Sequence, residues 1–475
     1  MAERLQVPGA ANYWEKAAMA TVGLNFGSAT SGTGFDVAST VTSILAIESA
    51  VETPWKAQIA SLQAQDAALS GLGTNLSSLS TAVNSLTTFD GVLASKLGSS
   101  SNTAVLTLSS ASSSAVAGSH SLVVNSLAST SSQYSDNVRN SADLLTGSLT
   151  VQIGSSAAQT LTLDSGGNTL SDLAVKINGG AYGVTASVIT DTQGSRLSVV
   201  SQTSGAAGEV TLNSALTDTA TGSSVGFSIG QHGADAQLTV DGLSTTSSSN
   251  TVTGAIPGVT FQLLSAVPGA QVQVQITNNN GAVESSVQSL VSAYNATVAS
   301  IKTQEGKDSN GKAEPLFGDP TLALLQNGLA ASLFGGAGTG TATGISSITQ
   351  LGLSLGVDGT LTLDLNALGS ALNSKFASVT GFFQNSGSFG LNLSSALESL
   401  GSVSSKGAIS LALQQNSSQE AGLTQNIGTE ETRVAADKTR LTAELNLANQ
   451  ILQSIPDQVS QIDKIYSAVT GYNTK

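Results

Sequence analysis

Residues 36 to 89 read DVASTVTSILAIESAVETPWKAQIASLQAQDAALSGLGTNLSSLSTAVNSLTTF, and their apolar side chains recur at spacings of three and four. One row of this heptad pattern comprises Val41, Trp55, Leu62, Leu69, Leu76 and Val83. The other row comprises Ile44, Val51, Leu72, Leu79 and Leu86, and the polar residues Glu48, Gln58 and Gln65 interrupt the pattern. A lone helix in water cannot bury such a stripe, so the pattern predicts a long helix that packs against a partner.

A matching stripe lies at the other end of the chain, between residues 409 and 469. It comprises Leu423, Ile427, Val434, Leu441, Ala448, Ile451, Ile455, Val459, Ile462 and Val469. We therefore expect an α+β multidomain fold, with the terminal helices paired as a coiled-coil stalk and antiparallel β domains inserted between them. Most apolar stripes at helical spacing are intramolecular core. The length of these two stripes favours packing between subunits for at least part of them.

The composition limits the classes of function. Charged residues make up 10% of the 475 residues, aromatic residues make up 4%, and the formal net charge is −14. Such a charge repels phosphate backbones and anionic membrane surfaces, so neither nucleic-acid nor membrane-surface binding is expected. The chain has no cysteine, which excludes disulfides and thiolate metal sites. Its length predicts roughly three domains.

Between the two stripes the period changes to the two-residue alternation of strands. Apolar and polar residues alternate near 104–108, 149–153, 184–188, 237–240 and 271–276, which predicts short antiparallel strands. A short helix is expected from Thr169 to Asn178, with Thr169 and Asp172 spaced as a capping box. Further helices are predicted at 283–301, after Asp319 and Pro320, and at 368–383.

The first 35 residues lack periodicity, and their glycines predict a flexible segment that ends at Asp36, the expected N-cap of the first helix. Met19 is an alternative to Met1 as the start of translation. Pro54, with Thr53 as its cap, is expected to begin a second helix after a kink. A Sec signal peptide is not expected, because the N-terminus lacks a continuous apolar run, so secretion would need a dedicated route. The longest uncharged run, 321–357, is broken by glycines and predicts no membrane span.

No residue pattern predicts an active site. The two histidines, His120 and His232, are expected to be surface residues rather than metal ligands. Asp308 and Asn310 near Gly311 resemble a calcium loop but lack a glutamate at the twelfth position, so a plain turn is expected. The glycine-rich run 335–344 lacks the Lys-Ser/Thr pair of a phosphate-binding loop. We expect no catalytic, cofactor-binding or metal site, and a hydrolase is the least supported alternative.

Several further segments stand in a characteristic order. They are SGTGFDVASTVTSILAIESAVETP, HSLVVNSLASTSSQYS, NTLSDLAVKINGGAYGVTASVI, NTVTGAIPGVTFQL, VSAYNA, PLFGDPTL and LGLSLGVDGTLTLDLNAL. Together they resemble the flagellar filament-cap proteins, also called the flagellar hook-associated protein 2 (FliD) family. The third segment contains Ile177 and Asn178, a pair similar to a short motif shared by flagellar hook and filament proteins. The resemblance extends from about residue 32 to residue 469.

The resemblance implies a non-enzymatic structural protein that is exported unfolded through the flagellar type III apparatus, without a cleaved signal peptide and with an export chaperone as a partner. It implies a homo-oligomeric ring, commonly of five subunits, at the distal tip of the bacterial flagellum outside the cell. This ring would retain exported flagellin and promote its folding and insertion into the growing filament. The implied domains are a flexible segment 1–35, leg helices 36–103, a first plate domain 104–144 and 234–280, a second plate domain 145–233 inserted into it, a leg domain 281–408 and a C-terminal leg helix 409–475.

Two alternatives stay open on the sequence. A β plate at the tip could be an adhesin that binds glycans, although the chain offers few aromatic residues to stack on sugars. The chain could also be another axial protein, such as a flagellin or a hook–filament junction protein. For a filament cap, the two stripes are the expected coiled-coil, oligomer or filament contacts.

The segments before Pro54 and after Leu441 are then expected to stay loosely ordered until they dock in the filament.

Overall fold

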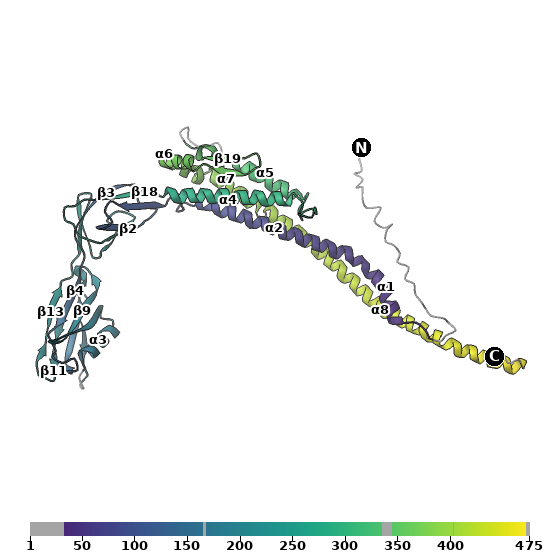
Figure 1. The fold of residues 1–475 in the computed structure, drawn as a ribbon, viewed down its shortest axis with the longest axis horizontal. Coiled ribbons are helices and arrows are strands. Elements are labelled where there is room, and N and C mark those ends of the chain that lie inside the picture. Colours follow the sequence, from purple (N-terminus) through teal and green to yellow (C-terminus); the bar gives the residue numbers. More distant parts are fainter. Residues whose placement is uncertain (1–32, 165–167, 335–343, 402, 472–475) are drawn as a thin grey trace. The chain divides into compact units, whose positions relative to one another are not determined.

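A computed structural model of the chain describes residues 33–164, 168–334, 344–401 and 403–471. The chain divides into two compact units, one formed by 1–80, 293–332 and 395–475 and the other by 81–292 and 333–394. Figure 1 shows the helices and strands of both units. The predicted glycine-rich loop at 335–344 lies, except for its last residue, outside the described residues, as does most of the predicted flexible N-terminus.

The α-helices are α1 Val37–Glu48, α2 Glu52–Thr87, α3 Leu170–Gly179, α4 Asn280–Gln304, α5 Pro320–Phe334, α6 Leu365–Gln384, α7 Phe389–Leu400 and α8 Ala408–Thr470. Short 3₁₀ turns are η1 Ser49–Val51, η2 Ala206–Gly208 and η3 Ile348–Leu351. The first ten strands are β1 Lys96–Ser100, β2 Leu106–Ala111, β3 Gly118–Ser126, β4 Thr130–Ser135, β5 Leu145–Thr146, β6 Ser148–Ile153, β7 Gln159–Thr162, β8 Val184–Asp191, β9 Gly194–Ser204 and β10 Val210–Ser214. The others are β11 Leu216–Asp218, β12 Ser224–Val225, β13 Phe227–Gln231, β14 Ala236–Val240, β15 Leu243–Ser247, β16 Thr251–Thr253, β17 Val259–Leu263, β18 Val272–Asn278, β19 Leu353–Leu355 and β20 Leu361–Leu363.

The two ends of the chain meet in the first unit, where α1 and α2 run beside α8 (Figure 1). Asp36 caps α1, since its side chain accepts a hydrogen bond from the Ser39 backbone N–H at 3.1 Å, as predicted. The Nδ2 atom of Asn416 on α8 donates to Oδ1 of Asp66 on α2 at 2.8 Å. The predicted contact between terminal helices, with antiparallel sheets between them in the sequence, is confirmed.

The predicted break between the first two helices is a short 3₁₀ turn, and it lies before the expected position at Pro54. The turn η1 separates the two helices, and α2 begins at Glu52 rather than Pro54. The predicted cap Thr53 is therefore already helical. Pro54 lies in the first turn of α2, where its missing N–H costs no helical hydrogen bond.

The deepest part of the first unit is formed by leucines of α2. Leu62, Leu69, Leu72, Leu76 and Leu79 are all buried, and Leu72 and Leu79 are fully so. These side chains face inward because spacings of three and four return to the same side of a helix. The heptad pattern therefore marks a true core row in this helix.

The second unit contains two β cores. In the first, a five-stranded antiparallel sheet of order β1-β18-β3-β14-β15 packs with a three-stranded sheet of order β16-β17-β2. Asp241 and Gly242 join β14 to β15 with φ angles of 51° and 87°. Both angles are positive, as in the two-residue turns that match the twist of a hairpin.

The second β core comprises a four-stranded sheet of order β13-β4-β9-β8, two three-stranded sheets (β10-β6-β7 and β12-β11-β5) and the helix α3. Helix α3 has the predicted capping box, because the Thr169 and Asp172 side chains each accept a bond from the other's backbone N–H. The chain passes between the two cores twice, and Ser129 pairs with Ala234 where it does so.

The remaining helices of the second unit pack around three phenylalanines. The rings of Phe382 and Phe389 stack with centroids 4.9 Å apart, and Phe383 meets Phe382 edge-on. Nearby, Nε2 of Gln384 donates to the carbonyl oxygens of Leu86 and Thr88 at 3.3 and 2.8 Å. Gln384 therefore satisfies carbonyl groups that the end of α2 leaves without helical partners.

Leu72→Ala should destabilise the first unit by about 2–5 kcal/mol, because it removes a fully buried side chain and leaves a cavity. Leu411→Ala is the matched control, since Leu411 of α8 is exposed and its truncation should stay within about 0.5 kcal/mol. Urea denaturation followed by circular dichroism measures both. Equal effects from the two variants would contradict the assignment of the core row.

Candidate assembly interface

Helix α1 lies on α8 through a small apolar cluster. Val37, Val41 and Leu45 are buried and pack against Phe35 and against Val434, Leu441 and Leu445 of α8. At the start of this contact the Phe35 backbone N–H donates to Oδ1 of Asn449 at 2.8 Å. The contact of α1 with α8 therefore ends near Asn449.

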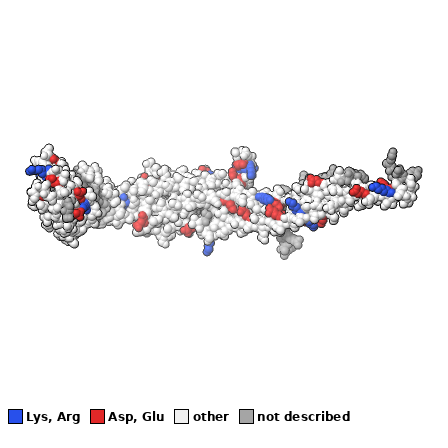
Figure 2. All heavy atoms as spheres, turned by 90° about the horizontal axis from the view of Figure 1, so that it is seen from below, with Lys and Arg blue, Asp and Glu red and all other residues white. Residues whose placement is uncertain are grey.

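Charged residues border this contact on α8. Arg433 bonds Glu430 and Asp437, Arg440 bonds Asp437 and Glu444, and Arg433 lies 3.9 Å from Glu48. The hydrogen bond to Glu430, reinforced by Glu48 and Asp437, raises the pKa of Arg433 above its usual range. Figure 2 shows how sparse charged side chains are on the face that it draws. Exposed pairs contribute only about 0–1 kcal/mol each, so apolar contacts decide the packing.

Beyond Asn449, the apolar row of α8 is half-buried at Leu452 and Ile455, and most of its other apolar side chains are exposed. Ile451, Val459, Ile462, Ile465, Tyr466 and Val469 are exposed, with Ile462 64% and Val469 80% accessible. The helix is unbroken through this stretch and includes Pro456. An apolar row that stays exposed to solvent over several helical turns is a typical contact site for another protein.

The sequence-predicted contact residues fall into three groups by burial. Val41, Leu62, Leu69, Leu72, Leu76, Leu79, Val83 and Leu86 are buried. Ile44, Trp55, Leu423, Ile427, Val434, Leu441 and Ile455 are half-buried. Val51, Ile451 and Ile462 are exposed.

The sequence reasoning missed Leu45, which is buried where the adjacent Ile44 is not. The prediction assumed one continuous heptad register from residue 36 to residue 89. The turn η1 separates α1 from α2, so the two helices do not share that register. The sequence reasoning also missed Leu445, Ile465 and Tyr466, which a second heptad row on α8 would have included. The pair Ile177 and Asn178 lies at the end of α3, with Ile177 fully buried in the second β core.

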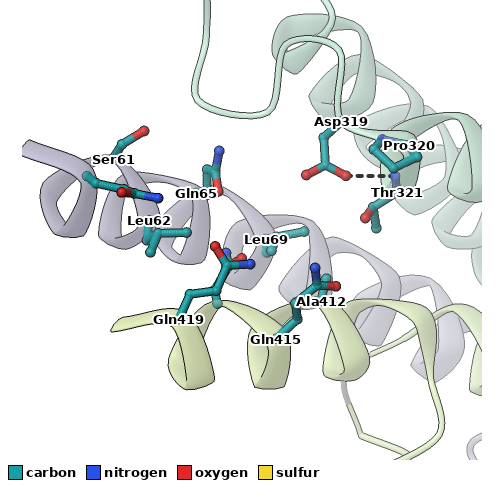
Figure 3. Close-up of a pocket in the computed structure, with 12 residues that line it drawn as sticks. Ser61, Leu62, Gln65, Leu69, Asp319, Pro320, Thr321, Ala412, Gln415 and Gln419 are labelled. Atoms are coloured by element: carbon teal, nitrogen blue, oxygen red, sulfur yellow. Dashed lines mark hydrogen bonds between the residues drawn. The ribbon is translucent and has the colours of Figure 1, made fainter. Parts of the chain in front are cut away.

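A cavity of about 360 Å³ lies between α2, α8 and the start of α5. Figure 3 shows Gln65, Gln415 and Gln419 around it, with Leu62 and Leu69 on α2 and Asp319 at one end. Asp319 is engaged as the cap of α5, where its Oδ1 accepts the Thr321 N–H at 2.7 Å. The polar lining consists mainly of neutral amide side chains, and no nucleophile in it is hydrogen-bonded to a base. The cavity is therefore suited to hydrogen bonding and not to catalysis.

The two histidines lie at the surface of the β domains and pair with carboxylates. Nδ1 of His120 is 2.7 Å from Asp241, and Nδ1 of His232 is 2.9 Å from Glu209. The partners are distant in the sequence, which is why spacing could not predict them. Asp308 accepts the backbone N–H groups of Asn310 and Lys312, as in a plain turn. Among the described residues there is no cluster of three potential metal ligands.

None of the helices in the described part of the chain is long and apolar enough to cross a membrane.

The fold and this surface define a class: a structural assembly protein whose terminal helices pair and whose β domains are inserted between them. Sequence profiles of one family cover most of the chain. The profile of the flagellar hook-associated protein 2 N-terminus matches residues 33–131, and that of the C-terminus matches residues 233–470. The chain belongs to the flagellar hook-associated protein 2 (FliD) family.

Individual relatives agree with this assignment. The B-type flagellar hook-associated protein 2 of Pseudomonas aeruginosa is 30% identical over 324 residues, which cover 62% of this chain and 67% of the relative. The flagellar hook-associated protein 2 of Escherichia coli is 26% identical over 402 residues, covering 78% and 84%. The crystal structure of the D1-D2-D3 domains of the Escherichia coli cap protein FliD superposes with a TM-score of 0.59 at 25% identity, covering 74% of this chain and 99% of that one.

The chain is therefore a filament-cap protein of the bacterial flagellum. Its place is the extracellular tip of the filament. Its family is structural and non-enzymatic, and forms an oligomeric cap with flagellin. Family membership also decides against a flagellin or a hook–filament junction protein.

Leu45→Ala should loosen α1 without unfolding α2. The α1–α8 contact buries only three apolar residues of a 12-residue helix, and so short a helix is marginal on its own. Hydrogen exchange of α1 amides should accelerate while the amides around Leu72 keep their protection. Ile47→Ala, at an exposed position of the same helix, is the control and should leave exchange unchanged. Faster exchange throughout α2 in Leu45→Ala would show instead that α1 is part of one cooperative core.

The pH dependence of the first β domain should include Asp241. The hydrogen bond from His120 and the backbone N–H of Ser121 hold the pKa of Asp241 below its usual range. A carboxyl whose pKa is lower in the folded state adds stability at pH values above its pKa in the unfolded chain, about 3.9. This stability is lost as the pH falls through the pKa of the folded state. Asp241→Asn, which tolerates positive φ, should flatten the loss of stability below about pH 4.

Urea denaturation at several pH values measures this change in slope. The control is Asp90→Asn, since Asp90 makes only a 3.5 Å bond to Ser113. The same slope in native protein and Asp241→Asn would contradict the role of this pair.

Proposed function

We propose that copies of this chain form a closed ring, commonly of five subunits, that retains exported flagellin at the tip and promotes its folding and insertion. The observation that carries the proposal is the set of exposed apolar side chains on α8 between Ile451 and Val469. This row continues the side of α8 that α1 covers, so a partner helix could extend an interface that already exists within the chain. In a cap protein, the partners at hand are flagellin and neighbouring copies.

The division of labour that we propose assigns the plate to the two β cores and the legs to the helices. The buried residues of the first core lie within 105–128 and 236–276, and those of the second lie within 138–225. Strand β4 and Val138 pack with the second core. We therefore place the junction between the two plate domains near residue 129 and not at residue 144. The chain returns to the first plate domain near residue 234. Strand β1 pairs with β18, so the plate also includes 96–100.

A leg must bind the growing filament repeatedly without locking onto it. Full burial of one large apolar side chain contributes about 1.5–3 kcal/mol, and docking costs rotational, translational and side-chain freedom that offsets much of the sum. A single row of such residues therefore supports an affinity compatible with release at each step. The buried residues of α2 would keep the leg itself intact. The segments before Pro54 and after Leu441, which contact each other, would become fully ordered only on docking.

We also propose that the chain is exported unfolded by the flagellar type III apparatus, with a dedicated chaperone. The absence of cysteine supports this proposal, because an unfolded chain of this sequence cannot be trapped by disulfides. An apolar row that is exposed before assembly is a surface that a chaperone can cover. The chaperone and flagellin would then bind in turn, not together.

The double variant Ile462→Ser/Ile465→Ser tests the row. Both residues are exposed, so the variant should fold as the native chain does. In cells that lack their own cap, the native chain should restore swimming and stop flagellin from leaking into the medium, whereas the variant should do neither. The control is Gln458→Ser/Gln461→Ser, at exposed polar positions of the same helix, which should complement fully.

Normal complementation by Ile462→Ser/Ile465→Ser would exclude the row as the filament contact. Particle images of the same preparations report ring formation separately. They therefore distinguish a defect in docking from a defect in assembly.

A further inference from the structure

Strand β8 forms one edge of the four-stranded sheet β13-β4-β9-β8. It has eight residues, all of which pair with β9 on one side. In an antiparallel edge strand, alternate residues direct both N–H and C=O away from the sheet, and such groups are a template for another strand. An edge of this length is long enough to accept a neighbour.

The register identifies the outward-facing residues of β8. Thr190 is opposite Ser195, whose N–H and C=O are both bonded to Val138 on the other side. The backbone groups of Thr190 are therefore directed outward, and those of Val188 and Ala186 follow at the same two-residue interval.

Asn178 occupies one of these outward positions. Its Oδ1 accepts the Ala186 N–H at 2.8 Å, and its Nδ2 donates to the Ala186 carbonyl at 2.7 Å. These are the two bonds that a residue of an added strand would make. Asn178 is held there by its neighbour Ile177, which is fully buried in the second β core. The Asn178 side chain thus occupies the edge near the start of β8, and the outward backbone groups of Val188 and Thr190 follow it along the strand.

We propose that Asn178 is an edge guard that prevents β8 from pairing with β8 of a second copy. Pairing through backbone groups needs no special partner sequence, and an identical strand is available on every other copy. An antiparallel β8–β8 pair keeps Asp191, the one charged residue of the strand VTASVITD, away from its own counterpart. Ile189, 59% exposed on this strand, would gain apolar cover in such a pair. This inference rests on the sheet alone and not on the proposed function.

The test uses the full-length chain, which has no cysteine, with Ile189→Cys as a reporter. A thiol crosslinker with a span of about 8 Å reaches directly opposite and diagonal neighbours across paired strands. With Asn178 present, little crosslinked dimer should form. In Ile189→Cys/Asn178→Ala, dimer should rise about tenfold, the change that recovered backbone hydrogen bonds can produce, and it should increase with protein concentration.

Two further variants separate edge guarding from a simple loss of stability. Adding Thr190→Pro should abolish the dimer, because it removes an outward N–H, which an edge strand tolerates. Asn178→Asp loses the bond to the Ala186 carbonyl but places a charge at the edge, so it should stay uncrosslinked.

The proposal is overturned if Asn178→Ala gives no more dimer than the native residue, or if Thr190→Pro leaves the dimer unchanged. Failure of Asn178→Ala to fold would also overturn it, because the residue would then serve folding and not protection. Extensive crosslinking with Asn178 in place would show that the edge is already paired in the native assembly.

Discussion

The structure depends on covering the apolar side of one very long helix. Helix α8 has 63 residues and would extend about 95 Å if straight. A single helix has no apolar interior of its own, so its apolar row is shielded from water only where another element covers it. Helices α1 and α2 from the opposite end of the chain supply that cover, and the apolar cluster with α1 ends close to Asn449. The uncovered remainder follows directly from this difference in length.

The low charge of the chain makes apolar contact decisive. Only 10% of the residues are charged, and the exposed ion pairs of Arg433 and Arg440 contribute little to stability. Burial of leucines on α2 and of valines and leucines in the two β cores therefore holds the fold together. The same physics favours the exposed apolar end of α8 as the site of the contact with a neighbouring molecule that we propose.

The sequence predicts local features well because their causes are local. The cap Asp36, the capping box of α3 and the leucine row of α2 all depend on residues within a turn or two of one another. The prediction fails where a residue's environment depends on an irregular turn or on residues distant in the sequence. The heptad spacing favours Ile44 as the core residue, but Leu45 is buried instead because the turn η1 interrupts the helix register. No spacing rule could show that His120 contacts Asp241. The position of Asn178 against Ala186 likewise depends on which strand ends the sheet.

The most direct test of the account is whether the two ends of one chain lie side by side. Asp66→Cys and Asn416→Cys place the only two thiols on facing positions of α2 and α8. Nitroxide labels at these sites should show strong dipolar broadening, and the broadening should persist when labelled protein is diluted with unlabelled protein. Absence of broadening, or its loss on dilution, would mean that the helices do not pair within one chain and would contradict the account.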